Sequence, residues 1–247
     1  MFYGNFSGEN KNNFNNSIAA FKHCFKKVYA ADNLITFNRN LTFMQDSDFS
    51  KSFQENVSNK QEDSLKWRVH TLCWTASHCV NIPGDFVECG VYLGFSMSVV
   101  AEYLDFSKVR KKMYLYDTYE GIPDEYNSEQ RSNKVYKSNP KIYEQVIQKF
   151  AKYKNVIPVK GIVPDSFKTK CPRKISFLHI DMNSSRSEIA ALEHLFDKVT
   201  KGGIIVFDDF GWMGYDKQTI AEIEWLKNHN HKILELPTGQ GMVIKNN

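Results

Sequence analysis

The sequence predicts an α/β domain built on a seven-stranded, mostly parallel sheet that ends in an antiparallel hairpin, with a helical cover at the N-terminus. Two observations carry this prediction. After Pro83, short β-branched or aromatic runs alternate with helical segments, which is typical of a parallel sheet with crossover helices. The last two runs, KILEL and GMVIK, are separated only by residues 237–240. A connection this short cannot cross over the sheet, so these two strands must pair antiparallel.

The predicted strands are short apolar runs bounded by polar segments. They cover residues 85–89, 112–117, 156–160, 175–181, 203–208, 231–236 and 241–245. Helices are predicted between them at residues 94–104, 139–152 and 187–199, and a loop is predicted at 161–172. These connections are long enough for parallel pairing of the first five strands. The terminal hairpin distinguishes the pattern from the usual dinucleotide-binding order.

The N-terminal part of the chain has weaker patterns. Six asparagines and two glycines occur in the first sixteen residues, which we expect to be mobile because they bury little apolar surface. From the candidate N-cap Ser17, apolar residues recur at steps of 3 and 4, which predicts a helix to about Ala31. These residues are Ile18, Phe21, Phe25 and Val28. Residues 32–60 show no sustained period and predict irregular covering structure.

A second amphipathic helix is predicted at residues 64–80, directly before Pro83 and Gly84. Its apolar residues recur at the same helical spacing and are Leu65, Val69, Leu72, Cys73, Ala76 and Val80. We therefore divide the chain into a variable N-terminal cover or lid at residues 1–63, partly disordered, and a main domain at residues 64–247.

Composition excludes several classes of protein. The chain has 247 residues, of which 42% are hydrophobic and 24% charged, and its 32 basic and 28 acidic residues leave a net charge of +4 without long runs. This balance predicts no nucleic-acid partner. No apolar stretch approaches the roughly 18 residues of a membrane span, and no secretory pattern opens the chain. Five scattered cysteines without a CxxC pair favour a reducing, cytoplasmic location.

The first strand of the domain leads into a glycine-bearing turn toward a helix. Glu88, Gly90 and Gly94 give the spacing E-x-G-x-x-x-G, which lacks the G-x-G-x-x-G of pyrophosphate-binding turns. Glycines let the backbone approach a ligand closely, and an acid suits an amine better than a phosphate. These features fit the aminoacyl end of S-adenosylmethionine. The same glycines are also compatible with a tight turn that binds nothing.

Two further strand ends extend this candidate cofactor site. Asp117 follows the second strand, where an acid can accept both hydroxyls of a ribose, although it can instead cap the turn with Thr118. The third strand ends before Gly161 and Ile162, a place for adenine to lie against backbone and an aliphatic side chain.

Three carboxylates follow the fourth and fifth strands. If these strands are neighbours, Asp181, Asp208 and Asp209 converge and repel one another unless they are protonated or bridged by a cation. Oxygen ligands favour Mg²⁺, Mn²⁺ or Ca²⁺, and such an ion would orient a diol and acidify one hydroxyl. Each aspartate alone is also compatible with a helix cap or turn. His179 shares the strand face of Asp181, but we interpret it as a hydrogen-bonded core residue rather than a base.

Three aromatic residues and a methionine follow the acid pair. They are Phe210, Trp212, Met213 and Tyr215. These side chains can form the apolar wall of a sugar-binding site, or they can pack against the core.

Five ordered motifs resemble the macrocin O-methyltransferase family. They are GDFVECGVYLGFS at the end of 67–96, YDTYEGIP at 116–123, HIDMN at 179–183, GGIIVFDDFGW at 202–212 and LPTGQGMVIK at 236–245. The resemblance covers about residues 64–245. It implies a Rossmann-like class I methyltransferase that uses S-adenosyl-L-methionine to methylate sugar hydroxyls in glycan or natural-product biosynthesis.

The resemblance also implies roles for individual residues. Those matching the motif for the methionine moiety are Glu88, Gly90, Tyr92, Gly94 and Ser96. Asp117 matches the ribose-binding acid, with Thr118 beside it, and Asp181, Asp208 and Asp209 match the ligands of Mg²⁺ (or Mn²⁺). The family typically carries a general base where this chain has Asn183, which cannot accept a proton at neutral pH. Asp181, Asn183 and Asp209 are therefore the candidate catalytic residues.

These inferences predict a cytoplasmic, metal-dependent O-methyltransferase acting on a hydroxyl of a sugar or glycosylated small molecule. We also expect a homo-oligomer, a dimer or larger, as the family implies. Because of Asn183, a non-catalytic cofactor-binding module is the main alternative. An NAD-dependent oxidoreductase is a weaker alternative, since the glycine spacing and the terminal hairpin argue against it.

Overall fold

The computed structural model describes residues 8–247, and its core is a seven-stranded sheet of order β5-β4-β3-β6-β7-β9-β8. The first five strands of this sheet pair in parallel, whereas β9 is antiparallel to both β7 and β8. The predicted fold class and the terminal hairpin are confirmed. The strands are β3 (Asp85–Cys89), β4 (Met113–Asp117), β5 (Val156–Lys160), β6 (Ile175–Ile180), β7 (Val199–Phe207), β8 (Leu234–Glu235) and β9 (Gly241–Ile244).

The register aligns the ends of four neighbouring strands. Cys89 pairs with Tyr116 on one side and with Ile180 on the other, and Ile180 pairs with Phe207. The residues that follow these pairs therefore lie at one edge of the sheet. They are Gly90, Asp117, Asp181 and Asp208.

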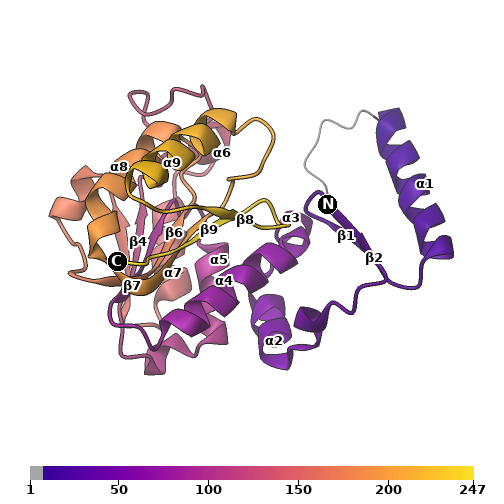
Figure 1. Cartoon of the computed structure of the whole chain (residues 1–247), viewed down its shortest axis with the longest axis horizontal. Helices are drawn as coiled ribbons and strands as arrows, with labels where there is room; N and C mark the ends of the chain where they lie inside the picture. The colour runs from indigo at the N-terminus through magenta and orange to yellow at the C-terminus, as the bar shows by residue number, and fades with distance from the viewer. Residues whose placement is uncertain (1–7) are drawn as a thin grey trace.

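Helices cover both faces of the sheet (Figure 1). On one face, α4 (Lys66–Cys79), α5 (Phe95–Tyr103) and α7 (Ile142–Phe150) pack in the larger apolar core. On the other, α8 (Ser185–Leu195) and α9 (Asp216–Asn228) pack in the second core. The predicted helix 64–80 corresponds to α4, and the short α3 (Lys60–Ser64) precedes it. The sequence prediction missed α9 and the short α6 (Lys134–Lys137).

The predicted helix from Ser17 to about Ala31 differs from the structure at both ends. Residues 1–7 lie outside the described part of the chain, and α1 (Gly8–Cys24) begins before Ser17. The helix also ends before Ala31, because Val28–Ala31 forms β1 and pairs with β2 (Leu34–Phe37). Asp32 and Asn33 both have positive φ, of 49° and 56°, as a two-residue hairpin turn requires. Phe25 packs on Phe37 across this reversal, so its apolar character marked a contact rather than a longer helix.

Residues 32–60 are more regular than predicted. Besides β2, they contain a 3₁₀ turn at Thr42–Gln45 and the helix α2 (Ser47–Asn56). Asp46 caps α2 by accepting hydrogen bonds from the amides of Asp48 and Phe49. Phe49 and Phe53, one turn apart, are fully buried in the larger core. Two apolar residues in a ten-residue helix were too few to reveal a period.

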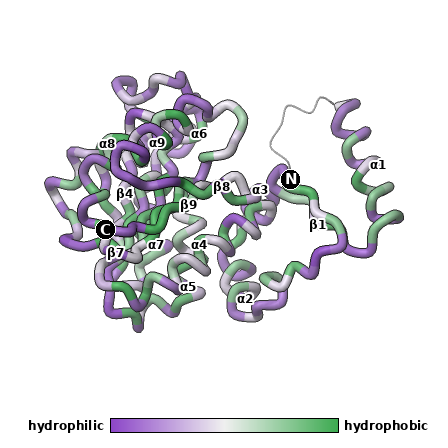
Figure 2. The backbone as a smooth tube through the Cα atoms, in the orientation of Figure 1, coloured by the Kyte–Doolittle hydropathy of each residue, from purple (hydrophilic) through white to green (hydrophobic). Residues whose placement is uncertain are grey.

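The N-terminal segment extends from the body of the protein (Figure 1). Helix α1 has no buried residue. In Figure 2, hydrophobic colours gather along β7 and β9, whereas α1 is mixed along its length. In the part of the chain described here, no helix combines the length and apolar character needed to cross a membrane.

A pair of buried carboxyl groups joins α8 to α9. Glu188 and Glu222 are both fully buried, and Glu188 accepts a hydrogen bond from the amide of Met182 through Oε1 at 3.0 Å. Burial raises the pKa of Glu222 to about 7, and burial together with Glu222 raises the pKa of Glu188. The pair therefore holds a proton in the folded protein and supports the loop that follows β6.

This pair makes folding stability depend on pH. Because the folded-state pKa of Glu222 is raised from 4.5 to about 7, its contribution is present below pH 4.5 and is lost as the pH rises through 7. The loss is on the order of 3 kcal/mol. We expect Glu222→Gln to abolish most of this dependence and to exceed wild type in melting temperature above pH 7. The matched control is Glu224→Gln on the exposed face of α9, and equal pH profiles for all three proteins would contradict the assignment.

Candidate active site

The turn after β3 depends on a close approach of two backbones. Gly90 has φ of 89°, and a Cβ atom at this position would lie 1.8 Å from the backbone oxygen of Asp181. No side chain is tolerated there, so Gly90 allows the ends of β3 and β6 to touch. Gly94 begins α5 with φ of 69°, and a Cβ atom there would lie 2.8 Å from the ring of Phe150. Gly94 thus has a packing role.

Asp117 braces this turn from the end of β4. Its Oδ2 accepts hydrogen bonds from the amides of Val91 and Tyr92 at 2.7 and 2.8 Å, and its Oδ1 accepts one from the amide of Tyr119 at 2.7 Å. A carboxylate has about four acceptor positions, so much of its capacity is used within the protein. Its predicted ribose contact stays a prediction.

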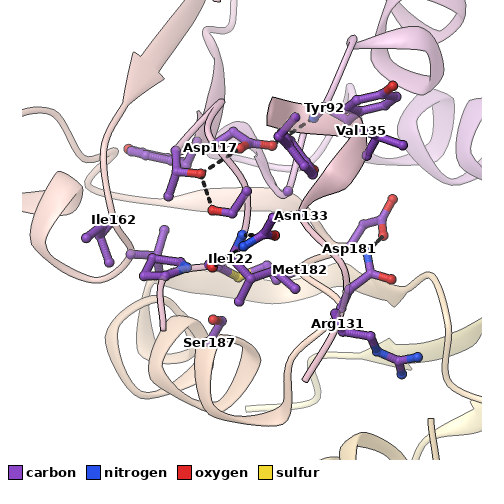
Figure 3. A pocket seen from close by; sticks show the side chains of 18 of the residues that line it. Tyr92, Asp117, Ile122, Arg131, Asn133, Val135, Ile162, Asp181, Met182 and Ser187 are labelled. Carbon is purple, nitrogen blue, oxygen red and sulfur yellow. Dashed lines mark hydrogen bonds between the residues drawn. The ribbon is translucent and has the colours of Figure 1, made fainter. Parts of the chain in front are cut away.

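A cavity of about 360 Å³ lies at the ends of β3, β4, β5 and β6 (Figure 3). It brings together several of the predicted cofactor-binding residues, which are Gly90, Tyr92, Asp117, Thr118, Gly161 and Ile162. Its other side is the long segment after β4, where Asn133 exchanges hydrogen bonds with both the amide and the carbonyl of Ile122. We call this space the cofactor cavity.

A second cavity of about 740 Å³ lies next to it, and we call it the acceptor cavity. Glu88 and Ser96 line this second space rather than the first. The aromatic residues Trp212 and Tyr215 and the exposed Met213 contribute to its wall, whereas Phe210 is buried in the core. Tyr92, Asp181 and Asn183 line both cavities, so these three residues mark where the two spaces meet.

His179 connects two of the predicted site residues. Its Nδ1 lies 2.9 Å from Oε1 of Glu88, and its Nε2 lies 3.5 Å from Oδ1 of Asp208. Burial opposes the charged imidazole, but these two carboxylates raise the pKa of His179 to about 10. The interpretation of His179 as a hydrogen-bonded core residue is confirmed, and the two carboxylates in addition favour its charged form. The fully buried ring is a charged link between the cofactor side and the acid cluster.

Oε2 of Glu88 has no hydrogen-bond partner among the described residues, although it is buried. Burial raises the pKa of Glu88 to about 6, while His179 acts in the opposite direction. A buried acceptor without a partner is costly unless a ligand satisfies it. An ammonium group is the donor best suited to it.

Arg68 of α4 lies among the acids at the edge of the sheet. Its Nη1 donates to Oδ2 of Asp208 at 2.5 Å and lies 3.4 Å from Oδ1 of Asp209. Its Nε donates to Oδ2 of Asp32 at 3.0 Å, which ties the β1–β2 turn to the site. The guanidinium also lies 4.7 Å from the ring centre of Trp212.

The three predicted acid residues do converge, but they differ in charge state. Burial would raise the pKa of Asp208, yet Arg68 and His179 hold it well below its usual range. Burial and the charge of Asp208 raise the pKa of Asp209 to about 6. Burial, with Asp208 and Asp209 nearby, raises the pKa of Asp181 well above that of an ordinary aspartate.

Asn183 connects Asp181 to the aromatic wall. Its Nδ2 donates to Oδ1 of Asp181 at 3.3 Å, and its Oδ1 accepts a hydrogen bond from the hydroxyl of Tyr215 at 2.7 Å. The guanidinium of Arg131 lies over the Tyr215 ring, 3.8 Å from its centre. An amide can donate and accept at once, so the asparagine suits both partners.

The fit of a divalent ion to this cluster can be judged from the carboxylate oxygens. Asp208 presents Oδ2 to Arg68 and accepts from Nε2 of Gln240 through Oδ1 at 3.0 Å. Asp209 presents Oδ1 to Arg68. Within residues 8–247, no group of three or more His, Cys, Asp or Glu side chains is arranged to hold a metal ion. The donors have the right chemistry for magnesium, but in this arrangement a guanidinium occupies them.

Sequence reasoning missed Arg68, Asp32 and Gln240. A signal existed for Arg68, because it lies three residues after Leu65 and four before Leu72, on the apolar stripe of the helix. An arginine on such a stripe is buried and needs a partner. No comparable local signal marks Asp32 or Gln240, since their roles depend on contacts between distant segments.

The strand order, the terminal antiparallel pair and the cavity at the strand ends define the class I methyltransferase fold. Solved structures support this class. The O-methyltransferase NovP superposes with a TM-score of 0.61 at 20% identity, covering 73% of this chain and 80% of its own. The calicheamicin methyltransferase CalS11 superposes with a TM-score of 0.58 at 15% identity, covering 80% of this chain and 91% of its own. Residues 66–236 match the macrocin-O-methyltransferase (TylF) family, and the chain belongs to it.

Two curated relatives are similar over part of the chain. The 8-demethyl-8-(2,3-dimethoxy-alpha-L-rhamnosyl)-tetracenomycin-C 4'-O-methyltransferase of Streptomyces olivaceus is 25% identical over 168 residues, which are 62% of this chain and 61% of the relative. The demethyldecarbamoylnovobiocin O-methyltransferase of Streptomyces niveus is 27% identical over 141 residues, 53% of this chain and 54% of the relative. The matched region thus spans less than two thirds of either relative.

The position of Asn183 leads to a prediction for Asn183→Asp. The new carboxylate cannot donate to Asp181 and adds a negative charge beside it, so we expect kcat/KM for methyl transfer to fall about tenfold or more. Tyr215→Phe, which removes only the hydroxyl that orients Asn183, should lower it less. Steady-state kinetics on both variants tests whether Asn183→Asp loses more of its kcat/KM than Tyr215→Phe does. A gain of activity in Asn183→Asp would show instead that a general base was missing.

Proposed function

We propose that this protein is an S-adenosylmethionine-dependent O-methyltransferase acting on a hydroxyl of a sugar or glycosylated small molecule. The observation that carries the proposal is the meeting of two cavities at Tyr92, Asp181 and Asn183. Methyl transfer needs a donor and an acceptor held in line at short range, with little other chemistry from the protein. The boundary that the two cavities share at Asp181 would bring donor and acceptor together beside a carboxyl group.

The residues present fit S-adenosylmethionine at three places. The buried, unpartnered Oε2 of Glu88 suits the α-amino group. Because Glu88 lines the acceptor cavity, the methionine part of the cofactor would extend past the boundary between the two cavities. Gly90 leaves the backbone open at the turn. Gly161 and Ile162 line the far part of the cofactor cavity, where an adenine has backbone and aliphatic contacts. When bound, this cofactor supplies a methyl group on a positively charged sulfur.

The acceptor cavity contains, besides its charged residues, groups that suit a hydroxyl-rich ligand. The N-terminal segment contributes the amides of Asn33, Asn59 and Gln61, and the opposite side contributes Trp212 and Tyr215. Aromatic faces and amide groups are suited to sugar rings and their hydroxyls. The name of the Streptomyces olivaceus relative describes an acceptor that bears a rhamnosyl group, which supports the same class here.

Asp181 is the proton acceptor that we propose for the reacting hydroxyl. It lies on the boundary of the two cavities, and Asn183 orients it through a hydrogen bond to Oδ1. Its raised pKa makes it a stronger base than an ordinary aspartate once it is ionised. Asp209, on the acceptor side, and Asn183 complete the proposed catalytic set.

Metal dependence enters this proposal as a sequence prediction only. Asp181, Asp208 and Asp209 have the chemistry of magnesium ligands, but Arg68 takes the oxygens of two of them. We therefore assign no step of the reaction to a metal ion. The expected homo-oligomer and the cytoplasmic location also stay predictions.

A non-catalytic module remains the second candidate because Asn183 stands where the resemblance implies a general base. It differs from the proposed enzyme in one measurable property, since it would bind cofactor without turnover. An NAD-dependent oxidoreductase has less support, because the sheet order and the terminal antiparallel pair are those of the methyltransferase fold.

Calorimetric titration with S-adenosylhomocysteine and with NAD tests the cofactor assignment. We expect S-adenosylhomocysteine to bind and Glu88→Gln to weaken it about tenfold or more, because the variant loses the charge facing the amino group. Glu102→Gln, which alters a surface pair with Lys152, is the matched control and should bind like wild type. Binding of NAD alone would contradict the proposal.

Methyl transfer itself is tested with labelled S-adenosylmethionine and a panel of deoxysugar glycosides. Incorporation of label into at least one glycoside supports the enzyme. Tight S-adenosylhomocysteine binding with no transfer to any glycoside, and no slow hydrolysis of the cofactor, would favour the non-catalytic module.

A further inference from the structure

The described residues place a fixed cation inside the predicted metal site. The guanidinium of Arg68 contacts Asp208 through Nη1 at 2.5 Å and approaches Asp209 at 3.4 Å. Magnesium binds oxygen ligands at about 2.1 Å in a near-octahedral arrangement, usually through one or two carboxylates together with water. A divalent ion on Oδ2 of Asp208 would lie beside the guanidinium nitrogen that already contacts this oxygen, and the two cations would repel each other strongly.

Arg68 is also held from the side opposite the acid pair. Its Nε and Nη2 donate to the two oxygens of Asp32 at 3.0 and 3.3 Å. The Trp212 ring covers the guanidinium at 4.7 Å. The side chains of Arg68 and Asp32 are only 7% and 5% exposed. Swinging Arg68 away to admit a metal ion would leave the buried Asp32 without its partner, which is strongly unfavourable.

The chain supplies the charge that a metal ion would otherwise bring. Arg68 neutralises three acids from two segments, one in the β1–β2 turn and two directly after β7. The β6 acid, Asp181, lies outside these contacts and keeps its hydrogen bond from Asn183. The cluster is thus divided into a pair held by arginine and one acid at the cavity boundary.

We propose that Arg68 is the resident cation of this acid cluster and that it excludes a divalent metal ion from Asp208 and Asp209. Arg68 is a positioning residue: it fixes the two aspartates and fastens the N-terminal hairpin over the acceptor cavity. Arginine stays protonated in proteins, so the cluster keeps this charge at every working pH, and chelators do not remove it.

Manganese binding, followed by the paramagnetic resonance of free Mn²⁺ and by calorimetry, tests this inference on the full chain. We expect no saturable binding to wild type at micromolar Mn²⁺. Arg68→Met frees the carboxylate oxygens and should bind Mn²⁺ at least about tenfold more tightly. Adding Asp208→Asn to Arg68→Met should abolish the gain. Arg131→Met removes the neighbouring cation over Tyr215 and, as the matched control, should resemble wild type.

Melting temperatures keep the test decisive if Arg68→Met is unstable. Ligand binding to the folded state raises stability, so Mg²⁺ should raise the melting temperature of Arg68→Met and leave that of wild type unchanged. The double variant Asp32→Asn, Arg68→Met removes both members of the buried pair and should show the same response.

Micromolar Mn²⁺ binding to wild type that Asp208→Asn abolishes would overturn the inference, as would equal affinities for wild type and Arg68→Met. The inference concerns carboxylates that the proposed function also uses, but these measurements need neither cofactor nor acceptor. A failure of S-adenosylhomocysteine binding would instead count against the proposed function alone.

Discussion

Compensation of buried negative charge is the constraint on which the rest of this structure depends. The parallel register brings acids from several strands to one edge, where Glu88, Asp181 and Asp208 would repel one another without positive partners. Arg68 and His179 supply that charge from within the chain. Breaking a buried ion pair typically costs about 3–5 kcal/mol. Substitutions at the edge of the sheet that can bind ligands are therefore expected to lower the free energy of unfolding strongly.

The same contacts connect parts of the chain that are distant in sequence. Arg68 joins α4 to the β1–β2 turn and to the end of β7, while His179 joins β6 to β3 and β7. The N-terminal hairpin thereby belongs to the acceptor cavity, although α1 extends from the body of the protein (Figure 1). The buried pair Glu188 and Glu222 supports the loop after Asp181 from the other face of the sheet. Cofactor side, acceptor side and cover thus share one electrostatic network.

Much of this architecture could be predicted from the sequence because its signals are local. Strand runs, the four-residue connection at 237–240 and the glycine turn led to the correct sheet class. The N-terminal elements could not be predicted this way, since the helix at 8–24 buries nothing and α2 buries only three residues. At the site, the acids at the strand ends could be predicted from the sequence, but the residues that pair with them could not. A carboxylate that binds metal and one that binds arginine look the same in a sequence, and only the fold brings Arg68 to Asp208.

Two cavities meet at Asp181, and we propose that arginine, rather than a metal ion, balances the neighbouring acids. A crystal structure of the chain with S-adenosylhomocysteine, grown in Mn²⁺ and measured at the manganese absorption edge, tests both parts together. We expect the amino group of the ligand beside Glu88, the sulfur directed toward Asp181, Arg68 on Asp208 and no anomalous peak among the three aspartates. A manganese peak bound by Asp181, Asp208 and Asp209 with Arg68 displaced, or an adenine outside the cofactor cavity, would show that these assignments are wrong.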